Sequence, residues 1–418
     1  MTDPDKAAKA GTRAAAKTRN GSALPAGPMS AGAGVDSQPP ERAPIDQLCI
    51  NTIRTLSMDT VQQAGSAHPG LPTALAPVAY ALWQGFLRFD PAHPLWPNRD
   101  RFVLSDGHAS MVLCALLHLT GTRAVDTNGQ CLDRLLVSLD DIGHIRASNS
   151  HRPGHPDHSL TTSTESLSGP LGQGCAASVG MAITERLWAA HFNRPGFALF
   201  DYDVYAVCGD DDILGGITSE VASRAGHLML GNLCWIYHNN RITSEGHADL
   251  ALSDDVAARF LAYGWNVQKV SDANDTSRIA RAIEAFGRVH DVPTLIILES
   301  HTGFAAPYKH DTAAELGQPA GEEQTRLAKR SYNWPEDAKF LVPEGVRAHF
   351  DASIGRRGRR LEAAWTARLA AYRAQYPALA EEIDRMRARD LPGDWERALA
   401  DLAADPKALR HVLRLPRC

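Results

Sequence analysis

Asp210 and Asn240 are residues whose types and spacing suit the binding of a metal ion. Asp210 follows the short apolar run 205–208, and Asn240 follows a second apolar run, 232–237. Two strands joined by a crossover helix place both carboxyl ends at the same edge of a parallel sheet. A carboxylate, an amide oxygen and a backbone carbonyl just beyond Asn240 would converge there. Such an oxygen-only ligand set suits magnesium that carries phosphates.

The elements around this pair alternate between strand and helix along most of the chain. This alternation predicts an α/β fold, a doubly wound parallel sheet with helices on both faces. The expected strands are 101–104, 205–208, 232–237, 265–270 and 294–298, and the expected helices include 45–63, 73–86, 254–263 and 276–289. The crossover helix between the two polar turns is expected to carry an apolar stripe at Ile217, Val221, Leu228 and Leu230.

The length of 418 residues allows a large α/β domain with an extension. Residues 1–43 are rich in Ala, Gly, Pro and Ser and are expected to be a disordered tail. Asp3 and Asp5 count against a transit peptide. The α/β domain is expected over 44–322. Residues 323–418 predict a helical linker extension, with one apolar stripe at Leu361, Trp365, Leu369 and Tyr372.

Composition excludes several classes of function. The net charge of −5 provides no strong field for nucleic acid or an anionic membrane, and no apolar run is long enough to span a bilayer. The seven cysteines form no CxxC pair, and several lie in apolar segments. They are expected to be buried free thiols in a reducing, cytoplasmic environment.

Seven motifs, in order and at nearly the family's spacing, resemble the transketolase family over about residues 45–418. They are SAHPG (66–70), RDRFVLSDGHAS (99–110), RPGHP (152–156), SGPLGQG (168–174), HFNRPG (191–196), CGDDDILGGITSE (208–220) and YHNNRITSEGH (237–247). The last two resemble the thiamine-diphosphate signature, G-D-G followed after a spacer by N-N. In that family this region is the diphosphate-binding domain and the linker that follows it.

The resemblance implies a site for thiamine diphosphate and magnesium, or calcium. Asp210, Asn240 and the carbonyl of Ile242 would bind the ion. Gly209, Asp211 (through its backbone) and His108 would hold the diphosphate. Glycines at the start of the helix after 174 would let backbone N–H groups approach it.

Further roles follow from the same resemblance. Gly169 and Leu171 would lie near the aminopyrimidine. His68 and His155 would be catalytic, lining the substrate channel and moving protons on the sugar hydroxyls. Glu220 matches a glutamate of the carboxylate network at the subunit interface.

The implied activity is two-carbon ketol transfer between sugar phosphates, as in the pentose phosphate pathway. In full-length transketolases a pyrimidine-binding domain and a C-terminal domain follow this region, and the former brings the glutamate that activates the cofactor. Those domains are expected to be absent from this chain, so the expected partner is a separate chain of transketolase C-terminal type, with or without dimerisation. The isolated chain is expected to be inactive. The alternatives are a non-catalytic regulatory or interaction subunit, and a truncated fragment. A different thiamine-diphosphate reaction stays open.

Four departures from the family pattern favour the non-catalytic alternative. Asp211 replaces the second glycine of G-D-G, and its carboxylate would either repel a diphosphate or become an extra metal ligand. Gly215 replaces a glutamate of the interface network. Ser244 replaces an apolar side chain behind the cofactor's rings. Ala313 falls on the position of a catalytic histidine.

Three other interpretations are weaker. A zinc cluster of His151, His155, His158 and Cys175 is disfavoured because His155 already has a role and no other ligand pattern supports it. The glycines of 169–174 lack the order and the preceding strand of a nicotinamide fingerprint. The basic run 356–360 is most simply a solvated helix start, with an RNA contact as the alternative.

Overall fold

The structure, a computed structural model, describes residues 44–65, 70–105, 107–126, 128–144, 170–240, 242–243, 246–247, 253–300 and 321–404. These residues belong to one compact unit. The tail predicted for residues 1–43 lies outside the described residues. None of the described helices is long and apolar enough to cross a membrane.

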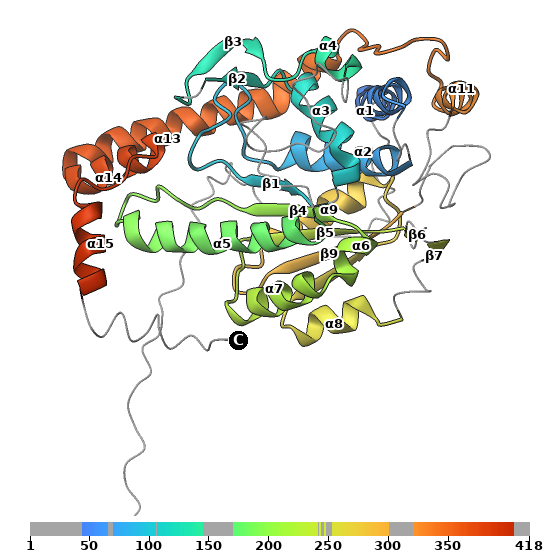
Figure 1. Ribbon diagram of the computed structural model, residues 1–418. Helices are drawn as coiled ribbons and strands as arrows, with labels where there is room; N and C mark the ends of the chain where they lie inside the picture. Colours follow the sequence, from blue (N-terminus) through green and yellow to red (C-terminus); the bar gives the residue numbers. More distant parts are fainter. Residues whose placement is uncertain are drawn as a thin grey trace, which may run out of the picture. The chain divides into compact units, whose positions relative to one another are not determined.

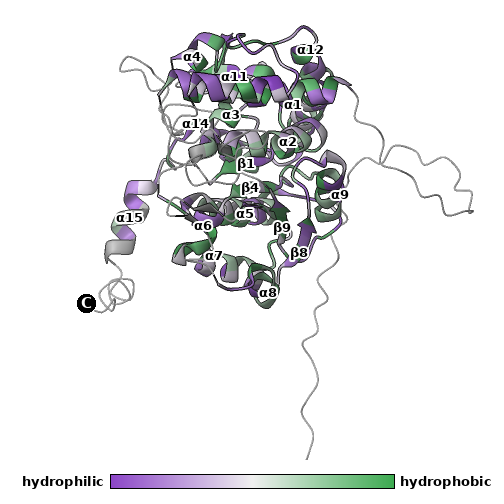
Figure 2. Cartoon of the chain, turned by 90° about the vertical axis from the view of Figure 1, so that its right-hand side faces the viewer, coloured by the Kyte–Doolittle hydropathy of each residue, from purple (hydrophilic) through white to green (hydrophobic). Residues whose placement is uncertain are grey.

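Five parallel strands form the central sheet (Figure 1). Their order is β1 (Arg101–Leu104), β4 (Val204–Cys208), β5 (Leu233–Asn239), β9 (Thr294–Glu299) and β8 (Asn266–Val270). All five lie close to the ranges predicted from the apolar runs. Figure 2 shows that β8, at one side of the sheet, is more hydrophilic than β4 in its interior. A charged side strand of this kind resists pairing with other chains.

Helices cover both faces of the sheet, which confirms the predicted fold class. One face packs against α1 (Pro44–Gln63), α2 (Gly70–Gly85), α3 (Ser110–Leu119) and α9 (Thr276–Phe286), and the other against α5 (Gln173–Phe192), α7 (Gly216–His227) and α8 (Val256–Ala262) (Figure 1). Alternate residues of β4 point to opposite sides: Tyr205 and Val207 belong to the first core, and Ala206 and Cys208 to the second.

The apolar stripe predicted for the crossover helix is only partly confirmed: Leu230 is buried and Val221 is half-buried against the second core. Ile217 is 42% exposed and Leu228, just beyond the helix, is 39% exposed. Small residues face the sheet instead: Thr218, Ala222, Ala225 and Gly226. A Cβ added at Gly226 would lie 1.8 Å from the carbonyl oxygen of Tyr263, so the helix approaches its neighbour too closely for large side chains. Close backbone approach, rather than a broad apolar stripe, positions α7.

A short hairpin and a helical turn lie in the stretch after α3, for which the sequence supplied no prediction. The hairpin pairs β2 (Arg123–Val125) with β3 (Cys131–Leu135), and α4 (Leu139–Gly143) follows. The imidazole Nδ1 of His118, in α3, lies 3.0 Å from the carbonyl oxygen of Val137. His118 is 3% exposed, and this burial lowers its pKa from the usual 6.5.

Protonation of His118 is therefore expected to destabilise the fold in mild acid. Below about pH 6.5 the unfolded chain takes up a proton that the buried imidazole resists, so stability falls as the pH falls through this window. His118→Asn, whose amide nitrogen retains a donor, should remove a slope of up to about 1.4 kcal/mol per pH unit. Denaturant unfolding of both chains between pH 7.5 and 5.5 measures the difference. Equal slopes would contradict the prediction.

The predicted extension is helical. It comprises α11 (Glu322–Ser331), α12 (Val346–Phe350), the π-helical turn η3 (Asp351–Gly355), α13 (Arg356–Gln375), α14 (Pro377–Ala388) and α15 (Trp395–Ala404). The predicted stripe of α13 is confirmed: Trp365, Leu369 and Tyr372 are buried, with Leu361 half-buried beside them. The indole nitrogen of Trp365 donates to the carbonyl of Leu199 at 2.7 Å. Separation of this extension from the α/β domain stays a prediction.

The basic run starts α13 as predicted, and Arg356, Arg359 and Arg360 are exposed, whereas Arg357 is not simply solvated. The guanidinium of Arg357 donates to the carbonyls of Trp83, Gln84 and Leu87 at the end of α2, at 2.8–3.2 Å. Arg359 forms an ion pair with Asp351 at 2.7 Å. Carbonyls left unpaired at a helix end are good acceptors, and Arg357 uses them to fix α13 on α2.

Candidate functional site

Asp210 and Asn240 lie together at the carboxyl edge of the sheet. Cys208, which ends β4, pairs in register with Tyr237 of β5, so the turns after both strands are neighbours. The Asn240 backbone N–H donates to Asp210 Oδ2 at 3.3 Å. Asp210 is 4% exposed and Asn240 is 9% exposed. The predicted convergence of the two residues is thus seen, whereas metal binding itself stays a prediction.

Tyr237 holds the Asp210 carboxylate in place, a role that the sequence interpretation missed. Its hydroxyl donates to Asp210 Oδ1 at 2.5 Å, and it also lies 3.3 Å from Asn239 Oδ1. Burial, and then the charge of Asp210, raise the pKa of Tyr237 well above its usual value, so the hydroxyl stays protonated as a donor. The period of two along a strand places Tyr237 and Asn239 on one side of β5, a signal that was available in the sequence.

Asp212 is a second residue that sequence reasoning missed. The predicted tight acidic turn is a short helix, α6 (Asp210–Leu214), and Asp212 is 1% exposed within it. Its Oδ1 accepts the Ser105 hydroxyl at 2.8 Å and the Gly172 N–H at 2.7 Å. Its Oδ2 accepts the Gly209 N–H at 3.1 Å. One buried carboxylate therefore joins the end of β1, the start of α5 and the turn after β4.

Glycines at the start of α5 serve packing, which corrects part of their predicted role. Gly172 has φ +77°, and a Cβ there would lie 2.6 Å from Thr218 Oγ1. A Cβ at Gly174 would lie 2.5 Å from the Ser105 Cα. The Gly172 N–H is already bound to Asp212, so it is not available to a diphosphate.

The other predicted positions are only partly described. Leu171 is 49% exposed just before α5. The backbone of His108 lies in the turn η1 (Gly107–Ala109), after β1 and at the same edge of the sheet. The backbone of Ile242 begins β6 (Ile242–Thr243), which pairs with β7 (Gly246–His247). Several positions lie outside the described residues. They are the predicted catalytic residues His68 and His155, the predicted cofactor-binding residue Gly169, and two departures from the family pattern, Ser244 and Ala313.

The residues present fit a hard divalent cation. The Asp210 carboxylate is buried and is oriented by the Tyr237 hydroxyl and the Asn240 N–H. One carboxylate with neutral amide and carbonyl oxygens is the donor set that magnesium prefers. The chemistry of the site is therefore compatible with a cation that carries a diphosphate.

Comparison with known proteins decides the family. A family model described as "Transketolase, thiamine diphosphate binding domain" matches residues 45–392. The chain belongs to the transketolase family. It is 44% identical to transketolase from Geobacillus stearothermophilus over 355 residues, which cover 85% of this chain and 51% of that relative. It is 40% identical to transketolase 1 of Escherichia coli, with 85% and 52% covered.

A solved transketolase structure has the same fold. Transketolase from Pichia stipitis in complex with sedoheptulose 7-phosphate matches with a TM-score of 0.78 and 36% sequence identity, covering 85% of this chain and 50% of that chain. The chain spans about half the length of the curated relatives it matches. The resemblance seen in the sequence is thereby confirmed for the diphosphate-binding region.

Two departures from the transketolase pattern fall on described residues. Asp211 is half-buried in α6 and is not among the described residues with positive φ, so its backbone conformation does not require glycine. Gly215 separates α6 from α7, and a Cβ there would lie 3.2 Å from the Asp212 carbonyl oxygen. Glu220 is exposed on α7.

The zinc cluster considered from the sequence includes Cys175, which is fully buried in the second core. Its three histidines lie outside the described residues.

Proposed function

We propose that this chain binds thiamine diphosphate with magnesium and forms the diphosphate-binding half of a transketolase. The observation that carries the proposal is the contact between Asp210 and Asn240 at adjacent strand ends. Asp210, Asn240 and the Ile242 carbonyl would hold the ion. Gly209, the Asp211 backbone and His108 would hold the diphosphate, and Gly169 and Leu171 would contact the aminopyrimidine. Calcium is the alternative ion.

Thiamine diphosphate, when bound, supplies the stabilisation of a carbanion that ketol transfer between sugar phosphates requires. The chain's own residues would orient the diphosphate. His68 and His155 would move protons at the hydroxyl oxygens of the sugars. The buried Tyr237 and Asp212 would keep the metal-binding turn in one geometry, which preserves the alignment of reacting groups.

The pyrimidine-binding half would come from a separate chain. Exposed large apolar side chains in or next to α5 and α7 support this: they are Leu171, Leu187, Ile217, Leu228 and Met229. Glu220 is exposed on the same helix as Ile217. Large apolar residues gathered on one exposed surface are typical of protein–protein contacts. Glu220 would then meet the partner's carboxylates at the interface.

A reconstitution experiment tests this function. The chain is mixed with the carboxyl-terminal half of the Geobacillus stearothermophilus relative, thiamine diphosphate and magnesium, and transfer from sedoheptulose 7-phosphate to an aldose phosphate is measured. Turnover that needs both chains supports the proposal. Failure of the chain to bind the cofactor, alone or mixed, contradicts it. Ile217→Glu should weaken assembly, while Leu261→Glu, on the exposed side of α8, is the matched control.

A non-catalytic subunit is the second candidate. The half-buried Asp211 carboxylate, next to Asp210 in α6, favours it because a second negative charge opposes a diphosphate. Gly215, in place of a glutamate, favours it as well. Assembly with cofactor bound but without turnover in the same experiment would support this candidate.

Removal of the Asp211 charge is expected to tighten cofactor binding. At ~6 Å and an effective dielectric of ~20, each unit charge on the diphosphate is repelled by about 2–3 kcal/mol. If only half of this repulsion is relieved, Asp211→Asn should bind thiamine diphosphate about tenfold or more tightly than the parent chain. Asp211→Gly should have the same effect. Calorimetric titration in magnesium measures this, with Asp254→Asn as a control at an exposed aspartate. Weaker binding would show instead that Asp211 is a metal ligand.

A further inference from the structure

A histidine and two carboxylates form a cluster beside α13. His93 Nδ1 lies 2.9 Å from Asp90 Oδ2 and 3.9 Å from Glu362 Oε2. One ligand atom from each residue lies within 4.8 Å of the others. The loop that carries Asp90 and His93 leads into the amino end of β1, whereas Asp210 and Asn240 follow carboxyl ends. The cluster is therefore separate from the candidate cofactor site.

A positive charge nearby would stabilise the buried Asp90 carboxylate. It is 0% exposed, and a buried carboxylate without a cation is costly. Among the described residues, its ion-pair partner within 4 Å is the 57% exposed His93, which is neutral unless protonated. The Ala92 N–H donates to its other oxygen at 3.0 Å and fixes its orientation. The guanidinium of Arg359 also acts on Asp90, but from beyond ion-pair distance. A divalent ion at this position would supply a positive charge in direct contact with the carboxylate.

The protein holds the cluster rigidly. The His93 N–H donates to the Asp90 carbonyl at 3.1 Å, and the Trp96 N–H donates to the His93 carbonyl at 3.0 Å. Gly358 of α13 lies against this loop, because a Cβ there would be 2.1 Å from the Phe89 carbonyl oxygen. Preorganised ligands lose little entropy when an ion binds.

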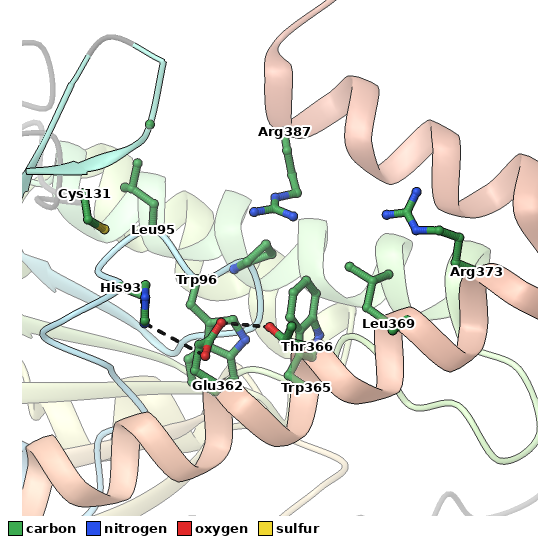
Figure 3. Close-up of a pocket in the computed structure, with 13 residues that line it drawn as sticks. His93, Leu95, Trp96, Cys131, Glu362, Trp365, Thr366, Leu369, Arg373 and Arg387 are labelled. Carbon is green, nitrogen blue, oxygen red and sulfur yellow. Dashed lines mark hydrogen bonds and ion pairs between the residues drawn. The ribbon is translucent and has the colours of Figure 1, made fainter.

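Glu362 is oriented in the same way as a metal-binding carboxylate. Thr366 donates its hydroxyl to Glu362 Oε1 at 2.8 Å, which leaves Oε2 directed at His93 (Figure 3). Hydrogen bonds of this kind commonly orient the ligands of metal sites. Ligand atoms ~2.1 Å from an ion are roughly 3.0–3.4 Å apart, so Glu362 has to move toward His93 by about 0.5 Å or more to complete the set.

A cavity of 440 Å³ adjoins the cluster and leaves room for further ligands of the ion. His93 and Glu362 line one part of it, and Arg373 and Arg387 line another (Figure 3). We propose that Asp90, His93 and Glu362 bind one divalent transition-metal ion, with its open positions toward this cavity. One imidazole nitrogen with two carboxylate oxygens favours zinc or manganese over magnesium.

Zinc titration of the whole chain tests the proposal. After chelation, the chain is titrated with zinc against a competing chelator dye, in excess magnesium and thiamine diphosphate so that the Asp210 site is occupied. One equivalent is expected to bind, and His93→Ala and Glu362→Gln should each lower the affinity at least about tenfold. Glu362→Gln retains the acceptor for Thr366, so its fold should be preserved, which its melting temperature without zinc verifies.

Three control variants separate this site from others. His191→Ala removes an exposed histidine that also pairs with a glutamate, at 3.0 Å, and should bind zinc as the parent chain does. Cys131→Ser removes a thiol that lines the same cavity, and Asp210→Asn removes the candidate magnesium ligand; both should leave zinc affinity unchanged. Absence of binding at millimolar zinc, or parental affinity in either His93→Ala or Glu362→Gln, would overturn the proposal. Loss in Cys131→Ser would also overturn it.

Discussion

Asp210→Asn is expected to abolish magnesium-dependent binding of thiamine diphosphate. The substitution keeps the side-chain volume and an oxygen that accepts the Tyr237 hydroxyl, now 2.5 Å away. It removes the charge that would face the cation, together with the acceptor of the Asn240 N–H. Loss of groups that merely support a metal ligand typically costs 10–100-fold in affinity, so loss of the charged ligand should cost at least about 100-fold.

Calorimetry with magnesium and thiamine diphosphate measures this loss. Asp254→Asn, at an exposed aspartate paired with Arg259 at 3.2 Å, controls for the change in net charge. Asp210→Asn should still unfold cooperatively without cofactor, at a melting temperature lowered only by the loss of the Asn240 N–H acceptor, which separates a binding defect from misfolding. Undiminished cofactor binding in Asp210→Asn would remove Asp210 from the metal site.

Lys329→Met is expected to destabilise the fold by about 3–5 kcal/mol, because it leaves a buried carboxylate without its cation. The Lys329 ammonium, 2% exposed, binds the carboxylate of Asp59, 5% exposed. It also donates to the Ala338 carbonyl at 2.6 Å, and the Phe340 N–H donates to Asp59 at 2.8 Å. The pair thus fixes α11 and the segment after it on α1.

Denaturant unfolding measures this effect, and two further variants define it. Lys339→Met breaks an exposed pair with Glu322 at 3.4 Å and should cost less than about 1 kcal/mol. The double variant Asp59→Leu with Lys329→Met removes both charges and should be more stable than Lys329→Met alone. If Lys329→Met and Lys339→Met unfold at the same denaturant concentration, the buried pair does not have the importance assigned to it.

Sequence patterns predicted the sheet and the convergence of Asp210 with Asn240 because both depend on local signals. A run of apolar residues marks each strand, and parallel topology fixes where its polar end lies. The hairpin after α3 was missed although Asn128-Gly129 is a turn signal, because β3 is mostly exposed and has no clean alternation.

Local sequence patterns did not predict the residues that support the site. Asp212 looked like one more residue of an acidic turn, and its partners Gly172 and Ser105 are 40 and 107 positions away. The stripe of α7 was partly misjudged for a related reason. Nothing near Gly226 in the sequence reveals that the Tyr263 backbone lies against it.

The three hydrogen bonds of Asp212 have a consequence for motion at the site. A segment of a folded protein opens as a unit when its parts share the contacts that hold it closed. One carboxylate accepts hydrogen bonds from the end of β1, the start of α5 and the turn after β4. Breaking one of these hydrogen bonds therefore weakens the other two. The amide hydrogens of Gly172 and Gly209 therefore belong to one cooperative unit of exchange with solvent, and a cation bound at Asp210 would slow the exchange of both amides.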